Sequence, residues 1–98
     1  MNSKIKIKGV ALIGDLPIPC LGEIEILNFN AEHRTAYAWW RIFDQDGKLL
    51  AAKSRNYFTD KADFSDLDVI PLILQNIKNY RIGRKHVFPE VEIIEYEG

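Results

Sequence analysis

The residues of this chain that could perform catalysis or bind a metal are few and scattered. His33 and His86 stand in separate segments, and neither lies in a spacing that makes a metal pair. Cys20 is the single cysteine, and neither it nor any serine lies in a nucleophile motif. The sequence therefore predicts no catalytic residue, no metal site and no cofactor, and we expect a protein that is not an enzyme.

A binding function is suggested instead by the segment from Thr35 to Tyr57, which combines aromatic and cationic side chains around a turn. The turn, residues 44–48, has aspartate at its entry and glycine near its exit, which suits a type I turn closed by a left-handed glycine. Asp44, Asp46 and Gly47 superficially resemble the start of a calcium loop, but the glycine comes too early and no glutamate follows at the required place. The segment is predicted to form a β-hairpin.

With Asp44 opposite Lys48, the hairpin sorts its side chains onto two faces. One face is predicted to pack against another layer; it holds Ala38, Trp40, Ile42, Leu50, Ala52 and Ser54. The opposite face is aromatic and basic; it holds Tyr37, Trp39, Arg41, Phe43, Leu49, Lys53, Arg55 and Tyr57. In this register Trp39 opposes Lys53 and Tyr37 opposes Arg55, which predicts cation–π pairs across the strands.

A second register remains open, because a two-residue turn centred on Asp46 and Gly47 would shift the second strand by one position. Trp40 would then lie with Lys53 and Arg55 on the outer face. Either register leaves a tryptophan on the same side as these two cations. Only the identity of the exposed tryptophan, Trp39 or Trp40, depends on the choice.

Three interpretations fit this aromatic and basic face. The aliphatic stems of the cations could cover a solvent-facing sheet, the face could bind protein, or its rings could stack on single-stranded nucleic acid. We expect an interaction or assembly module that binds a protein partner or itself, with single-stranded nucleic acid as the alternative. The predicted partner-binding residues are Tyr37, Trp39, Arg41, Lys53, Arg55 and Tyr57.

A short basic cluster follows the predicted helix and is the second place where a polyanion could dock. Its candidate contacts are Arg81, Arg84 and Lys85. Cations at a helix C-terminus also interact favourably with the helix dipole, so structure alone could account for them. A formal net charge of −1 disfavours strong non-specific binding to nucleic acid.

Length and composition indicate one small globular domain. The 98 residues are predicted to form a single domain, residues 1–98, with an ordinary 47% of hydrophobic and 28% of charged residues. The N-terminus lacks the apolar run of a secretory signal, and no apolar stretch is long enough to cross a bilayer. We therefore expect a cytoplasmic protein without a membrane partner.

The pattern of apolar residues predicts an α+β fold with the element order β-β-β-β-α-β. Strands are expected at 4–13, 23–29, in both arms of the hairpin and at 90–96, with a loop at 14–19 that contains two prolines. Apolar residues at helical spacing predict a helix with Asp68 as its N-cap, which would put Pro71 in the first turn. The expected architecture is an antiparallel or mixed sheet of about five strands with one helix packed on one face. The face without a helix is where we expect the function.

Overall fold

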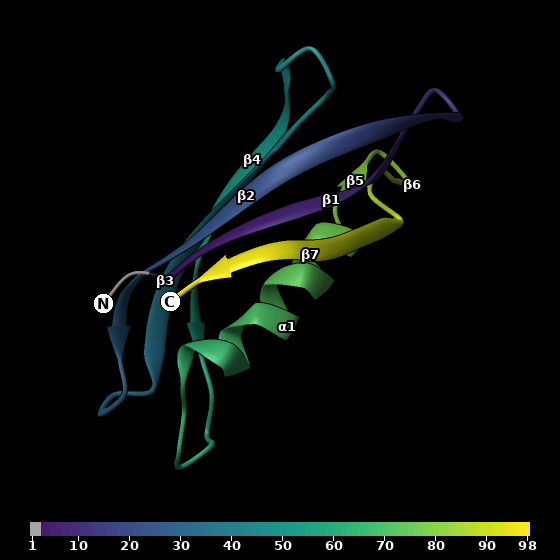
Figure 1. Ribbon diagram of the computed structural model, residues 1–98. Coiled ribbons are helices and arrows are strands. Elements are labelled where there is room, and N and C mark those ends of the chain that lie inside the picture. The colour runs from purple at the N-terminus through teal and green to yellow at the C-terminus, as the bar shows by residue number, and fades with distance from the viewer. Residues whose placement is uncertain (1–2) are drawn as a thin grey trace.

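The computed structural model describes residues 3–98, and these form an α+β fold, as predicted (Figure 1). The main sheet is antiparallel and has five strands in the order β4-β3-β2-β1-β7, with one helix on one side. A two-stranded hairpin, β5 and β6, follows the helix. The elements are β1 (Ser3–Ile13), β2 (Leu16–Asn30), β3 (Thr35–Phe43), β4 (Leu49–Phe58), α1 (Asp66–Lys78), β5 (Arg81–Ile82), β6 (Lys85–His86) and β7 (Glu90–Glu97).

The first hairpin is longer than its sequence indicated. The predicted loop at 14–19 is wrong, because Gly14 and Asp15 alone make the turn, with φ angles of 58° and 67°. Pro17 and Pro19 belong to β2 and pair with β1. They are tolerated there because the pairing of β2 with β3 begins only at Leu21, so a proline can turn its missing N–H toward the unpaired side.

Opposite charges on β1 and β2 help to set the register of this hairpin. Lys4 faces Glu25 and Lys6 faces Glu23 across the ladder. Directly opposed unlike charges stabilise an antiparallel pair, whereas a shift of one residue would turn these side chains toward the core. The strands with complementary charges are therefore direct neighbours in the sheet.

The helix begins at Asp66 and its N-cap is Ser65, so the predicted N-cap at Asp68 is wrong. Asp68 acts instead from inside the first turn, where its carboxylate accepts hydrogen bonds from the Ser65 backbone N–H at 2.8 Å and from Lys61 Nζ at 2.9 Å. These bonds and the favourable dipole interaction of an acidic first turn offset the backbone bond that Pro71 cannot donate inside the helix. Within residues 3–98 no helix is long and apolar enough to span a membrane.

The core lies between the sheet and one face of α1. Trp40 is at its centre, with its ring packed edge-on against Tyr80 and Phe88 at centroid distances of 5.6 and 6.2 Å. Buried aliphatic residues surround these rings, including Ile5, Ile7, Ile24, Ile26, Ile42, Val69, Ile73 and Ile77. The β1–β2 and β3–β4 turns of the main sheet extend past the helix, which leaves part of the sheet without a cover (Figure 1).

Asp66 joins β1 and β7, two neighbouring strands at one edge of the sheet, to the start of the helix. Its Oδ2 atom accepts hydrogen bonds from Ser3 Oγ on β1 and from the Tyr96 hydroxyl on β7, each at 2.5 Å. The bond from Ser3 and then that from Tyr96 lower the pKa of the Asp66 carboxyl below its ordinary value. Because these bonds favour the charged form, the native state holds the Asp66 proton less tightly than the unfolded chain does.

Acid should therefore remove the stabilisation that Asp66 provides. Its contribution is complete above the unfolded-state pKa of about 3.9 and is lost as the pH falls through the lower folded-state pKa. We expect Asp66→Asn to cost about 1 kcal/mol at neutral pH and to reduce the loss of stability below pH 4. Urea unfolding at several pH values measures both effects. The control is Asp60→Asn, an exposed position, and equal acid slopes for the Asp66 variant and the unmodified chain would contradict the assignment.

Candidate interaction groove

The β3–β4 hairpin has the predicted turn but not the predicted pairing. The Asp44 N–H donates to the Lys48 carbonyl at 3.0 Å, and Gly47 has a φ of 82°. Phe43 then pairs with Leu49, whereas the next pair is Ile42 with Ala51. Leu50 is an extra residue, a β-bulge, so every pair beyond it is shifted by one position relative to the first predicted register.

This bulge divides the predicted partner-binding residues between two faces. Trp39 faces Ser54 and Tyr37 faces Asn56, so the expected pairs of Trp39 with Lys53 and of Tyr37 with Arg55 are wrong. The face opposite the helix, here called the open face, holds Tyr37, Trp39 and Arg41, and the helix face holds Lys53, Arg55 and Tyr57.

The second register correctly put Trp40 on the same face as Lys53 and Arg55, but it placed that face outside. Trp40 is 3% exposed and lies beneath the helix. The two cations share its face because Lys53 pairs with Trp40 and Arg55 with Ala38, and they stay exposed because β4 is the edge strand of the sheet. A mixed aromatic and basic surface therefore exists, and it lies beside α1.

On the open face, basic side chains lie next to acidic side chains, so the charges largely cancel. Basic side chains of β1 and β3 alternate with acidic side chains of β7 and β2 in the strand order. Ion pairs join Lys6 to Glu95 at 3.6 Å and Lys8 to Glu92 at 3.3 Å. Arg41 stacks over Trp39 within its own strand, 4.5 Å from the ring centroid. Such a face gives a polyanion little net attraction, although it was where we expected the function.

A groove of about 340 Å³ lies on the other side of the sheet, between β4 and the C-terminal half of α1. Trp40 and Tyr57 are the most buried of its lining residues. The lining residues are Trp40, Lys53, Ser54, Arg55, Tyr57, Asn76, Asn79 and Tyr80. We call this the β4–α1 groove.

The groove is electropositive. Within the described part of the chain, neither Lys53 nor Arg55 has a carboxylate at ion-pair distance, and no acidic residue lines the groove. Lys53 Nζ lies 5.8 Å from the centroid of the Tyr80 ring. Two positive charges thus stand side by side on one strand without an anionic partner among residues 3–98.

Asn76 holds the polar side chains of the groove in place. Its Oδ1 atom accepts hydrogen bonds from Arg55 at 3.1 Å and from the Tyr57 hydroxyl at 3.0 Å. With Oδ1 fixed in this way, the Asn76 amide group is oriented as a further donor. Burial raises the pKa of Tyr57, and the positive charge of Arg55 opposes that shift. Tyr57 therefore remains a neutral donor near pH 7.

Strand β4 also has a free backbone edge beside the groove. The Thr59 N–H donates to the Arg34 carbonyl at 3.3 Å. Hydrogen-bonded and non-bonded pairs alternate along an antiparallel ladder. The backbone N–H and C=O groups of Ala52, Ser54 and Asn56 consequently point away from β3, and β4 is the last strand on this side of the sheet. The edge can accept one more strand.

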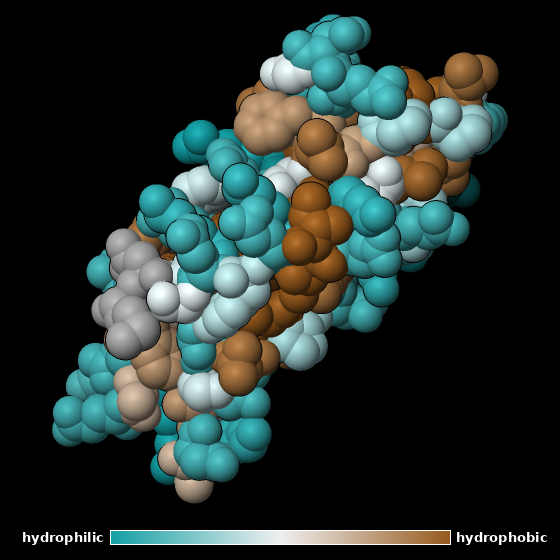
Figure 2. All heavy atoms as spheres, in the orientation of Figure 1, coloured by the Kyte–Doolittle hydropathy of each residue, from teal (hydrophilic) through white to brown (hydrophobic). Residues whose placement is uncertain are grey.

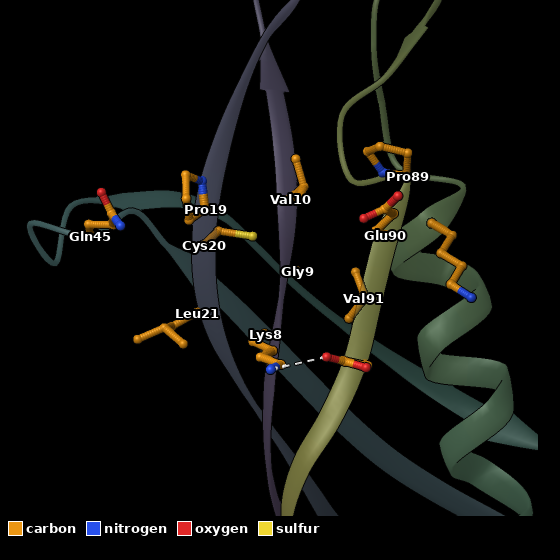
Figure 3. Close-up of a pocket in the computed structure, with 12 residues that line it drawn as sticks. Lys8, Gly9, Val10, Pro19, Cys20, Leu21, Gln45, Pro89, Glu90 and Val91 are labelled. Atoms are coloured by element: carbon orange, nitrogen blue, oxygen red, sulfur yellow. Dashed lines mark ion pairs between the residues drawn. The ribbon is translucent and has the colours of Figure 1, made fainter.

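A larger hollow of about 690 Å³ lies where β1, β2 and β7 run side by side (Figure 3). Its walls are mainly apolar, and the ion pair of Lys8 with Glu92 lies at its border. Hydrophobic side chains also gather near the β1–β2 and β3–β4 turns (Figure 2). The larger hollow has more room, but Glu90 and Glu92 are among its lining residues, and Lys8 already pairs with Glu92. We therefore take the β4–α1 groove, with its unpaired cations, as the candidate site.

The basic cluster after the helix lies on the exposed β5–β6 hairpin and is partly engaged. Arg81 Nε donates to His86 Nε2 at 3.1 Å, and Lys85 Nζ pairs with Asp15 at 3.1 Å. With Nε2 as an acceptor, His86 Nδ1 can donate to the Lys78 carbonyl, 3.1 Å away at the end of α1. These contacts support a structural role for the hairpin, and they leave Arg84 as the candidate contact without a recorded partner among the described residues.

Sequence reasoning missed the helix side of the groove. Asn76 and Asn79 have the polar spacing of a solvated helix face, and Tyr80 has the spacing of a core residue. Only the bulge at Leu50 brings β4 into the register that places its cations beside them. No protein-family model, curated protein or solved structure matches this chain, so its function has to be argued from the groove itself.

Proposed function

We propose that the protein is a non-catalytic interaction module that binds a protein partner by adding an extended segment of that partner to the free edge of β4. The observation that carries the proposal is the juxtaposition of this unpaired edge with the β4–α1 groove. Strand addition beside a helix supplies main-chain hydrogen bonds for affinity, and the groove offers contacts to alternate side chains for specificity.

The edge of β4 has features that favour pairing with a specific partner strand over indiscriminate pairing. Proteins protect free edges with bulges and cations, and β4 carries the bulge at Leu50 together with Lys53 and Arg55. These features restrict which strands can pair, because an incoming basic segment would be repelled. A partner that complements the charges would be accepted.

Single-stranded nucleic acid is the less supported function. Base stacking requires exposed ring faces, whereas Tyr57 is 6% exposed and Trp40 is 3% exposed. Trp39 on the open face is covered by Arg41 and lies opposite Glu25. The cations could contact phosphates, but the neighbouring rings are poorly placed to stack on bases.

A proline at position 54 tests the proposal. Ser54 directs its N–H outward, so Ser54→Pro should block strand addition while keeping the ladder to β3. Phage-displayed random octapeptides selected on the unmodified protein should bind at least 10-fold more weakly to Ser54→Pro and unchanged to Ser54→Ala, an expectation of about 1.4 kcal/mol for lost main-chain bonds. Circular dichroism confirms that both variants are folded.

Two results would contradict the proposal. Selected peptides that bind Ser54→Pro as well as the unmodified protein would place their contact away from the β4 edge. Failure to select any peptide whose binding is weakened by Ser54→Pro would also count against strand addition.

A further inference from the structure

We infer that the segment recognised at this edge is acidic, with carboxylates at alternate positions that meet Lys53 and Arg55. This inference rests on the proposed strand addition and names the chemistry of its partner. Lys53 and Arg55 are separated by one residue, so their side chains leave β4 on the same face about 7 Å apart. Two carboxylates separated by one residue on an added strand have the same spacing.

The charges around the edge favour this choice. Strand β4 contains two cations and no acidic residue, and among residues 3–98 neither cation is neutralised within the chain. Asn76 holds the Arg55 guanidinium beside the edge through the 3.1 Å hydrogen bond to its Oδ1 atom. Arg55 can still present its remaining donors to a carboxylate in a two-point contact.

A second copy of this chain is a weaker candidate for the added segment. Strand β7 is acidic and lies at the other edge of the sheet. However, its Glu92 and Glu95 already pair with Lys8 and Lys6 of the same molecule. Pairing of β4 with another copy's β7 would also join molecules head to tail, which gives a ring or an open chain and not a two-fold dimer. The structure therefore favours a segment of a different protein.

The test uses three synthetic heptapeptides in which valine alternates with glutamate, glutamine or lysine, each acetylated and amidated. Binding is followed through the backbone amide NMR signals of Ala52, Ser54 and Asn56. At low salt we expect the glutamate peptide to bind about 10-fold more tightly than the glutamine peptide, from two partly exposed ion pairs. The lysine peptide should bind more weakly than either, and salt at about 0.5 M should reduce the difference.

Matched variants assign the effect to the groove. The double variant Lys53→Gln and Arg55→Gln should lose the preference for the glutamate peptide. The control variant Lys4→Gln and Lys48→Gln loses the same amount of charge outside the groove and should keep this preference. Thermal melting establishes that both double variants are folded.

The outcomes separate this inference from the proposed function. Equal binding of the glutamate and glutamine peptides, both lost in Ser54→Pro, would overturn the acidic preference and leave strand addition standing. Absence of binding by all three peptides, or binding that Ser54→Pro does not affect, would overturn both. Binding of oligothymidylate to the same amides without binding of the glutamate peptide would overturn the inference in favour of a nucleic acid. Oligomers detected by light scattering and abolished in Ser54→Pro would overturn it in favour of a second copy.

Discussion

Trp40→Ala should destabilise the protein by about 3 to 5 kcal/mol, a large part of the roughly 5 to 15 kcal/mol that holds a typical domain together. The reason is the position of Trp40 beneath the helix, 3% exposed and packed against Tyr80 and Phe88. Removing the indole would leave a cavity at the centre of the core. Urea unfolding of the variant measures the loss directly.

Trp39→Ala is the matched control, because it removes the same side chain from the adjacent residue on the open face. Trp39 contacts Arg41 there and contributes nothing to the helix interface. We expect a loss below about 1 kcal/mol, as for surface substitutions in general. The first register predicted from the sequence buries Trp40, whereas the second register exposes it. The ratio of the two stability losses therefore tests which face of β3 is buried. Equal losses for the two variants would contradict the burial described here.

Gly9→Ala should have the second largest effect on stability, although it adds only one methyl group. A Cβ atom at Gly9 would lie 1.9 Å from the Glu90 carbonyl oxygen and 2.9 Å from the carbonyl carbon. Because these are backbone atoms, the start of β7 would have to move away from β1. We expect a loss of at least about 2 kcal/mol and a fall in melting temperature of roughly 10 °C or more.

The pairing near Gly9 explains why this displacement would spread. Gly9 pairs with Val91, and the Leu12 N–H donates to the Val87 carbonyl at 2.7 Å. The adjacent Phe88 is fully buried against Trp40. A shift of residues 87–91 would therefore disturb the core as well as the edge of the sheet.

Gly83→Ala provides the comparison for Gly9→Ala. Gly83 has no neighbouring atom within 4 Å of an added Cβ, and its φ of 65° is the source of strain there. We expect Gly83→Ala to reduce the free energy of unfolding by about 1 kcal/mol. Differential scanning calorimetry compares the two variants, and a Gly9 variant as stable as the Gly83 variant would contradict the close approach of β7 to β1.

Local patterns along the chain determined the elements and the fold class. Alternation of lysine and isoleucine specified β1 and its faces, because side chains alternate across a strand. The opposite charges of Lys4, Lys6, Glu23 and Glu25 are those that a β1–β2 ladder requires. Apolar residues at helical spacing located α1, and Asp44 with Gly47 located the hairpin turn.

The boundaries that failed were those where a residue's preference depends on its neighbours in space. Pro17 and Pro19 normally disfavour a strand, but they lie where β2 has a partner on only one side. Pro71 would normally be placed in the first helical turn, but Asp68 and Ser65 stabilise an earlier start. Local propensity could not reveal either circumstance.

The candidate groove was decided by tertiary structure alone. The sequence by itself determined that tryptophan and two cations share one side of the hairpin, since either register keeps them together. A single bulge at Leu50 decided which tryptophan that is, and packing of α1 against the buried face decided that Trp40 lies beneath the helix. A one-residue shift reverses the faces of a whole strand. Packing of Trp40 against Tyr80 and Phe88, residues far away in sequence, fixes which face of β3 the helix covers, so only the folded chain could place Lys53 and Arg55 beside α1.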